Sequence, residues 1–184
     1  MRKDFGKKTN LLVYPVLIIG TYDEFGNPNA MNAAWGGQTD TNKISIALAS
    51  HKTTDNLLKT GAFTVSFATE NTVEISDYFG ISTGNKEDKV KKSGVHVAKS
   101  AYVNAPIFEE YPLTLECKVV SYENEVLVGD IINLSADESI LDEKGNIVIE
   151  KMKPIIYEAG SHTYRKIGEV AGKAFKDGNK IKNA

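Results

Sequence analysis

The chain has 184 residues, of which 41% are hydrophobic and 25% are charged, and its formal net charge is −2. This composition is typical of one ordinary soluble domain, so we expect a single domain over residues 1–184. The balance of 22 basic and 24 acidic residues argues against a nucleic-acid-binding protein, because such domains are usually strongly basic. The expected partners are therefore small molecules or other proteins.

The cysteine content and the apolar segments indicate the compartment. A single cysteine, Cys117, rules out an intrachain disulfide and suits a reducing environment. Residues 1–10 are charged and polar where a signal peptide would need an apolar run, and the longest apolar stretches, 14–20 and 44–49, are too short to span a bilayer. These features predict a cytoplasmic protein that neither is secreted nor enters a membrane.

In chain order, the apolar patterns predict mainly strands. A turn at residues 23–28 follows the first apolar run, and short helices are expected at 53–60 and 71–80, each ending at a glycine. The predicted strands cover residues 13–21, 43–49, 63–67, 113–122, 126–134, 147–149 and 154–158. Strands joined mainly by turns and interrupted by short helices favour a mainly antiparallel β-barrel with helical insertions.

Two polar segments lie outside this pattern. Residues 81–105 are polar and mixed in charge, which predicts an ordered excursion from the barrel rather than part of its core. Residues 166–184 contain five lysines and few apolar anchors. This tail is expected either to drape over the surface or to hold a second subunit.

Two further segments together predict a ligand site. Residues 30–37 carry mostly small side chains, which let a flat ring lie against bare backbone. Residues 50–54 place hydroxyls next to His51 and Lys52 at a helix start, a favourable arrangement for a phosphate. A phosphate joined to a flat ring describes a nucleotide or flavin mononucleotide (FMN). The alternative is that Thr53 or Thr54 merely caps the helix and the small residues merely pack a tight barrel wall.

Other residues carry less information about chemistry. The histidines lack metal-ligand spacing, so no metal site is predicted. Cys117 lies in an apolar alternation and is expected to be a buried, inert thiol. Trp35 is expected either to stack near the bound ring or to sit in the barrel wall. No Rossmann or P-loop glycine motif is present.

Several motifs, in order, resemble one protein family. The motifs occupy residues 15–29 (Pro-x-Leu-Ile-Ile-Gly-Thr-Tyr-Asp-x-x-Gly-x-Pro-Asn), 30–36 (Ala-Met-Asn-Ala-Ala-Trp-Gly), 50–57 (Ser-His-Lys-Thr-Thr-Asp-Asn-Leu), 60–65, 79–84, 112–117 and 129–131. Their order and spacing, from Leu12 to Tyr164, resemble the flavin reductase-like family of FMN-binding split barrels, and in particular its flavoredoxin-like members. The resemblance implies a split barrel of Greek-key type that binds FMN non-covalently at a homodimer interface.

The resemblance also implies roles for individual residues. The segment from Ala30 to Trp35 would run along the isoalloxazine ring, and Lys52, where the family often has arginine, would bind the phosphate together with Thr54. Lys89 would approach the flavin edge, unless it belongs to a solvated charge run. The predicted cofactor-binding residues are Asn29, Ala30, Met31, Asn32, Ala33, Ala34, Trp35, Ser50, His51, Lys52, Thr53, Thr54, Asn56 and Lys89.

Three functions remain open from the sequence. In the first, NADH or NADPH reduces the flavin by hydride transfer to N5, a step that needs no side-chain acid, base or nucleophile. In the second, the protein is a flavoredoxin-like carrier that retains FMN and exchanges electrons with a redox protein partner. In the third, the protein binds flavin or another planar ligand without turnover.

Overall fold

The computed structural model describes residues 1–7 and 13–182, so Leu12, where the resemblance begins, lies outside the described residues. The helices are α1 (Lys52–Thr60), α2 (Val73–Ile81), α3 (Lys89–Ser93), α4 (Ile149–Met152) and α5 (Asn179–Lys182), with the short 3-10 turns η1 (Glu70–Thr72) and η2 (Glu138–Ile140). The strands are β1 (Tyr14–Pro15), β2 (Leu17–Tyr22), β3 (Pro28–Ala33), β4 (Gly36–Asp40), β5 (Lys43–Ala47), β6 (Ala62–Phe67), β7 (Val97–Lys99), β8 (Pro106–Phe108), β9 (Leu113–Glu123), β10 (Val126–Ala136), β11 (Ile155–Glu158) and β12 (Thr163–Lys166).

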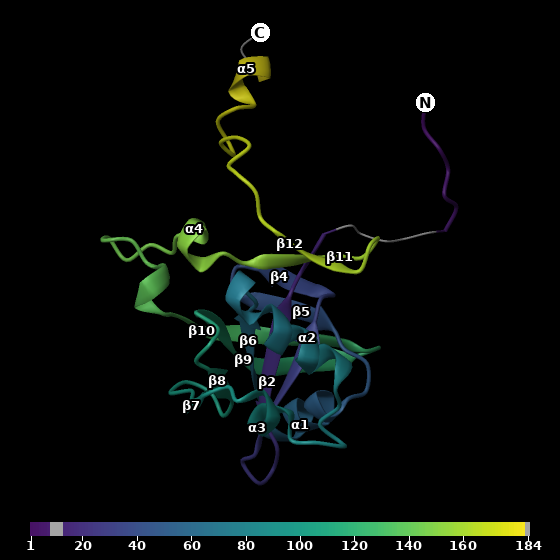
Figure 1. Cartoon of the computed structure of the whole chain (residues 1–184), viewed down its shortest axis with the longest axis vertical. Coiled ribbons are helices and arrows are strands. Elements are labelled where there is room, and N and C mark those ends of the chain that lie inside the picture. The colour runs from purple at the N-terminus through teal and green to yellow at the C-terminus, as the bar shows by residue number, and fades with distance from the viewer. Residues whose placement is uncertain (8–12, 183–184) are drawn as a thin grey trace.

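Seven of these strands form one antiparallel sheet in the order β3-β2-β6-β9-β10-β5-β4. The two edge strands, β3 and β4, are consecutive in the chain and are separated only by Ala34 and Trp35. Three Cα-to-Cα steps cover at most about 11 Å, so the two edges of the sheet must come close together. The sheet therefore curls into a half-barrel (Figure 1). The prediction of a mainly β, barrel-like fold with short helices is confirmed.

Strand β2 is buried on both faces, which explains its continuous apolar sequence. Leu17 and Ile19 belong to a cluster with residues of β5, β6, β9 and β10. Ile18 belongs to a second cluster with residues of α2, α3, β8 and β11. The predicted strand at residues 13–21 is thus divided, because β1 pairs with β11 in a separate three-stranded sheet.

The longest predicted hairpin is confirmed as β9 and β10. Its two-residue turn uses Asn124 at φ 50° and Glu125 at φ 62°, the left-handed conformation at both positions that matches the twist of an antiparallel pair. Further along β10, Gly129 leaves room for the Phe63 ring, since a Cβ there would lie 2.8 Å from the ring's Cε1 atom. The hairpin is therefore fitted closely to the barrel interior.

The prediction that residues 81–105 lie apart from the core is wrong. Val90 on α3 and Val95 after it are buried in the second apolar cluster with Phe79. The charged residues of this segment concealed that contribution, because Lys91 and Lys92 lie on the exposed face of the short helix α3 while Val90 lies on its buried face. The excursion therefore packs α3 against the outside of the barrel.

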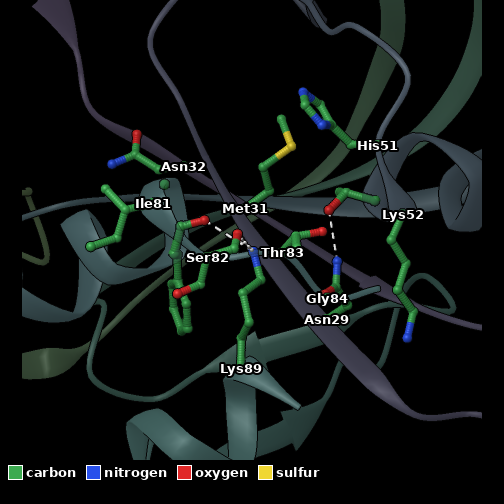
Figure 2. Close-up of a pocket in the computed structure, with 13 residues that line it drawn as sticks. Asn29, Met31, Asn32, His51, Lys52, Ile81, Ser82, Thr83, Gly84 and Lys89 are labelled. Atoms are coloured by element: carbon green, nitrogen blue, oxygen red, sulfur yellow. Dashed lines mark hydrogen bonds between the residues drawn. The ribbon is translucent and has the colours of Figure 1, made fainter. Parts of the chain in front are cut away.

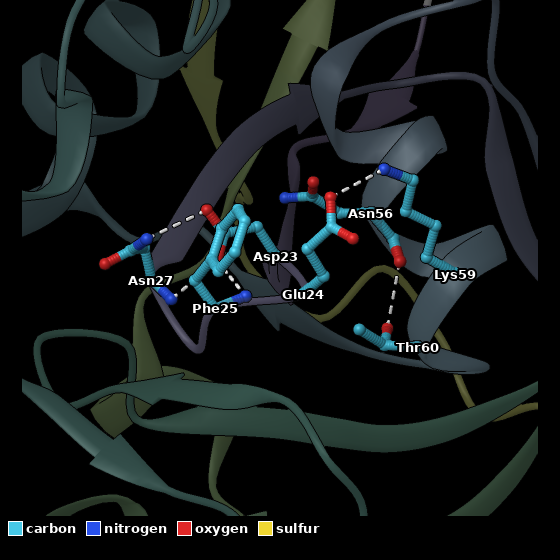
Figure 3. Close-up of polar contacts among 7 residues, drawn as sticks. All are labelled: Asp23, Glu24, Phe25, Asn27, Asn56, Lys59 and Thr60. Carbon is cyan, nitrogen blue, oxygen red and sulfur yellow. Dashed lines mark hydrogen bonds and ion pairs between the residues drawn. The ribbon is translucent and has the colours of Figure 1, made fainter.

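The structure also contradicts the alternative that Thr53 or Thr54 caps the first helix. The N-cap is His51, which makes no side-chain capping hydrogen bond, so neither Thr53 nor Thr54 caps the helix. Gly61 ends the helix at φ 70°, as expected. The turn between β2 and β3 is tied to this helix by the ion pair between Glu24 and Lys59, at 3.0 Å (Figure 3).

The C-terminal segment leaves β12 and runs away from the barrel (Figure 1). Residues 167–182 are exposed throughout, so the alternative in which the tail drapes over its own barrel is wrong for these residues. Among residues 1–7 and 13–182, no group of three or more His, Cys, Asp or Glu side chains is arranged to hold a metal ion. In the same ranges, no helix has the length and apolar character needed to cross a membrane.

Candidate functional site

A surface pocket of about 270 Å³ lies where β3, the start of α1, the end of α2 and the start of α3 meet (Figure 2). It brings together residues from the two segments, 30–37 and 50–54, for which a ligand site is predicted. The lining residues are Asn29, Met31, Asn32, His51, Lys52, Thr53, Phe79, Gly80, Ile81, Ser82, Thr83, Gly84 and Lys89. We call it the first pocket.

One end of the first pocket is suited to an anion. Helix α1 begins at this end, and its first backbone N–H groups have no partner within the helix. Lys52 supplies a cation beside them. The Thr53 hydroxyl oxygen accepts a hydrogen bond from the Asn29 amide nitrogen at 2.7 Å, so the hydroxyl proton is left to donate. A phosphate at this end would meet backbone donors, a hydroxyl and a positive charge together.

The loop after α2 closes the pocket against these residues. At Gly84 a Cβ would lie 3.1 Å from the Lys52 Cδ atom and would overlap the Asn29 carboxamide. At Gly80 a Cβ would lie 3.3 Å from the Cβ of Asn32. Gly80 therefore lets the end of α2 approach β3 closely, and Gly84 lets the following loop approach β3 and α1.

Lys89 is almost fully buried, at 4% exposure. Its ammonium group donates to the backbone carbonyls of Phe79 at 3.0 Å and Ser82 at 3.1 Å (Figure 2). Burial lowers the pKa of Lys89 to about 8, although the Glu87 carboxylate acts in the opposite direction. An ammonium has three donors, so one N–H remains for a ligand. The alternative of a solvated charge run is wrong for this residue.

Strand β3 contributes backbone groups as well as side chains. It is an edge of the large sheet, and no strand within the described ranges pairs with its outer side. An edge strand presents a row of N–H and C=O groups without partners. The Asn32 side chain lies at this edge, where its amide nitrogen donates to the Ser76 carbonyl at 2.8 Å. The edge can therefore hydrogen-bond a flat ring.

Of the predicted site residues, the first pocket gathers Asn29, Met31, Asn32, His51, Lys52, Thr53 and Lys89. Four others do not line it. Ala30 and Ala33 are buried in the two apolar clusters. Thr54 donates its hydroxyl proton to the Ala49 carbonyl at 2.7 Å, and the Asn56 amide donates to Thr21 at 3.1 Å inside the protein.

The remaining predicted residues do not line the first pocket either. Ser50 and Trp35 are exposed, Trp35 at 66%, and neither lines the pocket. The alternative that Trp35 fills the barrel wall is therefore wrong. Ala34 lines a neighbouring cavity. Cys117 is buried, and burial raises the pKa of its thiol to about 12, so it is an inert thiol as predicted.

Residues 79–84 line the first pocket, but they were not among the site residues predicted from the sequence. Their sequence, Phe-Gly-Ile-Ser-Thr-Gly, combines small residues with hydroxyls, the same signal that marked residues 50–54. Because the segment follows a predicted helix instead of beginning one, it has no helix N-terminus to indicate an anion site. Only the fold shows that it faces α1.

Comparisons with known proteins agree with this geometry. Residues 9–164 match the model of the flavin reductase like domain. The chain is 34% identical to flavoredoxin of Desulfovibrio vulgaris (Miyazaki F), covering 97% of this chain and 100% of that one with a TM-score of 0.93. It is 27% identical to flavoredoxin from Methanosarcina acetivorans, covering 98% and 99% with a TM-score of 0.88.

A further relative is an uncharacterized protein of Aquifex aeolicus, 28% identical over 121 residues. The match covers 64% of this chain, and the chain spans 62% of that relative's length. The domain match extends from before β1 into β12 and includes every residue that lines the first pocket. The chain therefore belongs to the flavin reductase-like family, and its barrel is the split barrel of that family.

Proposed function

We propose that this protein binds FMN non-covalently in the first pocket and uses it to accept hydride from NADH or NADPH. The observation that carries the proposal is the meeting of an anion-binding helix start, Lys52 and Thr53 with the unpaired edge of β3. When bound, FMN supplies two-electron chemistry at its ring nitrogen N5, which takes up the hydride.

The residues present fit the parts of FMN. Its phosphate matches the cation, the hydroxyl and the free N–H groups at the start of α1. Asn29 and Thr83 lie beside that end and offer polar groups for the ribityl hydroxyls. The ring carries several acceptor atoms along one edge, and backbone N–H groups of β3 would hold that edge.

The chain's contribution to the chemistry is electrostatic. Lys89 is held by two carbonyls, so its charge and its remaining N–H stay fixed at the pocket. A cation fixed beforehand stabilises negative charge that develops on a ligand without a cost of reorganisation. We infer that Lys89 and the β3 backbone favour the reduced state of the ligand.

A second function is favoured by a specific similarity. Two of the similar solved structures are flavoredoxins, and one of them is 34% identical over nearly the whole chain. In this alternative the protein retains FMN and passes electrons to a redox protein instead of taking hydride from a dinucleotide. The two functions share the pocket and differ in the donor.

We also propose a homodimer with about one FMN per chain. Ile132 and Leu134 on β10 are more than 40% exposed, as is Val120 on β9. The tail carries further exposed apolar side chains, including Val170 and Phe175. Apolar groups gathered on a surface mark protein contacts, and a second copy is the partner that the resemblance implies. A single domain over 1–184 and a cytoplasmic location stay predictions.

The first experiment tests the function itself. We expect the purified protein to bind FMN and its flavin absorbance to bleach when NADH or NADPH is added without oxygen. Bleaching by neither dinucleotide, with FMN bound, would favour the electron-carrier function. Failure to bind added FMN would contradict both.

The second experiment tests the dimer by light scattering at micromolar concentration. We expect the mass of two chains, and we expect removal of residues 167–184 to shift the equilibrium toward monomer because the tail's apolar side chains are lost. A stable monomer that binds FMN with full affinity would show that one subunit suffices.

The third experiment locates the phosphate. Lys52→Ala and Thr53→Val each remove a donor to a charged group, a contribution of roughly 1.5–3 kcal/mol, so each should raise the FMN dissociation constant about tenfold or more. Lys99→Ala on exposed β7 is the control and should change nothing. Unchanged affinity in both variants would place the phosphate elsewhere. Thr54→Val is measured beside them, and a larger loss there than in Thr53→Val would favour the role that the resemblance implies.

The fourth experiment uses the pKa of Lys89, which burial lowers to about 8. Between pH 8 and the usual lysine range, the unfolded chain holds a proton that the folded chain has lost. The free energy of unfolding should therefore rise with pH in this window, by at most about 1.4 kcal/mol per pH unit. Lys89→Met should abolish this contribution, whereas Lys91→Met, exposed on the same helix, should keep it. Equal slopes in the two variants, measured by urea unfolding, would show that Lys89 is not desolvated.

A further inference from the structure

A pocket of about 510 Å³ lies at the opposite end of α1 from the first pocket. It is bounded by the end of α1, the start of β6, the middle of β9 and the loop between β7 and β8. The lining residues are Thr60, Gly61, Ala62, Lys99, Ser100, Ala101, Tyr102, Val103, Asn104 and Lys118. We call it the lysine pocket. It shares no lining residue with the first pocket, and its volume is in the range of small-molecule sites.

The two lysines of this pocket have no acidic partner. Within residues 1–7 and 13–182, neither Lys99 nor Lys118 forms an ion pair. Asp130 lies opposite Lys118 across the β9–β10 pair, but its carboxylate accepts from Lys43 at 2.7 Å. No Asp or Glu lines the pocket. Its two positive charges are therefore left for a ligand that carries two negative charges.

A buried carboxyl group holds the loop that forms the pocket wall. Glu116 on β9 is 1% exposed, and it accepts hydrogen bonds from the Ser100 hydroxyl and from the Asn133 amide, the latter at 2.7 Å. The Ser100 oxygen in turn accepts from the backbone N–H groups of Tyr102 at 3.0 Å and Val103 at 2.9 Å. Burying a carboxyl group is costly unless its oxygens are satisfied. The network therefore fixes the wall of the lysine pocket, and Glu116 does not line the first pocket.

The end of α1 does not prevent an anion from binding. A helix C-terminus normally presents unpaired carbonyls, which disfavour negative charge nearby. Here the Asn56 carbonyl accepts from the Thr60 hydroxyl at 3.0 Å (Figure 3), and the Leu57 carbonyl accepts from the Gly61 N–H at 2.8 Å. The Gly61 carbonyl accepts from the Val119 N–H at 2.9 Å. These carbonyls are committed within the protein, so the two ammonium groups determine the sign of the charge in the pocket.

The loop also offers a ring and an amide. The Tyr102 side chain is 60% exposed and lines the pocket together with the lysines. An exposed aromatic ring presents a flat apolar face to a planar group. Asn104 is exposed on the same loop, and its carboxamide adds N–H donors. The pocket thus combines positive charge, N–H donors and an aromatic surface.

We propose that the lysine pocket binds a small phosphorylated aromatic molecule, with its phosphate at Lys99 and Lys118 and its ring against Tyr102. A phosphate monoester carries nearly two negative charges at neutral pH and three acceptor oxygens, which match the two ammonium groups and the Asn104 amide. A carboxylate brings one charge and would leave one lysine without a counter-charge. Lysine binds phosphate as a point charge, so no guanidinium fork is needed.

The experiment follows the backbone amide NMR signals of Gly61 and Asn104 in isotope-labelled protein, in phosphate-free buffer with one equivalent of FMN. The probes are phenyl phosphate, inorganic phosphate and benzoate. Lys99→Ala, Lys118→Ala and Tyr102→Leu each alter an exposed side chain of the pocket. Lys144→Ala is the matched control, because Lys144 is equally an exposed lysine but does not line the pocket.

We expect phenyl phosphate to shift both signals and to bind more tightly than inorganic phosphate or benzoate. Lys99→Ala and Lys118→Ala should each weaken phenyl phosphate about threefold or more, because each removes a charged donor. Tyr102→Leu should weaken phenyl phosphate about two- to tenfold and leave inorganic phosphate unchanged, because only the ring contact is lost. Lys144→Ala should change neither affinity.

The separation of the two pockets gives a second readout. Lys99→Ala should weaken phenyl phosphate without changing the FMN dissociation constant, whereas Lys52→Ala should do the reverse. Because the proposal does not depend on FMN, failure of the unaltered protein to bind FMN would contradict the proposed function alone.

Three results would overturn the proposal. Phenyl phosphate that shifts neither signal would show that the pocket does not bind it. Benzoate that binds as tightly as phenyl phosphate would show that the phosphate is not what the lysines recognise. Equal losses of phenyl phosphate affinity in Lys144→Ala and in the two pocket-lysine variants would mean that general surface charge attracts the probe.

Discussion

The two-residue connection between β3 and β4 is the constraint on which the rest of the molecule depends. A seven-stranded sheet whose outermost strands are joined by Ala34 and Trp35 cannot stay flat. The chain must curl, and the edge of β3 remains open because β4 is paired with β5 and not with β3. An open edge of a sheet usually invites aggregation. In this fold α1, α2 and α3 gather around that edge and convert it into the wall of a pocket.

The pocket wall is held together by buried polar contacts of a kind that sequence patterns do not display. Asn29 reaches Thr53 across 24 residues of chain, and Lys89 reaches back to the end of α2. A buried ammonium is costly unless its donors are satisfied, so the carbonyls of Phe79 and Ser82 and the lysine stabilise one another. Removing either side would leave the other without a partner. The loop after α2 therefore keeps its shape before any ligand arrives.

The sequence predicts most strands of the large sheet because they depend on local periodicity, whereas residues 147–149, predicted as a strand, form none, since Ile149 begins α4. The apolar alternation of β5 and β6 and the hairpin of β9 and β10 follow from residues close together in the chain. Residues 81–105 were predicted wrongly, since the burial of Val90 and Lys89 depends on contacts with α2 that polar composition conceals. The separation of Thr53, which lines the pocket, from Thr54, which does not, depends on helix rotation. A shift of one residue at the start of α1 would exchange them.

The first pocket and the neighbouring cavity lined by Ala34, Asp77 and Tyr164 differ in polar character. In the first pocket, the start of α1 and the lysines leave donors free, whereas in the neighbouring cavity the Tyr164 hydroxyl proton is already donated to the Asp77 carboxylate. Asn32 stands in the wall between them with its nitrogen fixed to α2. A ligand rich in acceptors would therefore meet complementary donors in the first pocket, whereas in the neighbouring cavity it would face the Asp77 carboxylate.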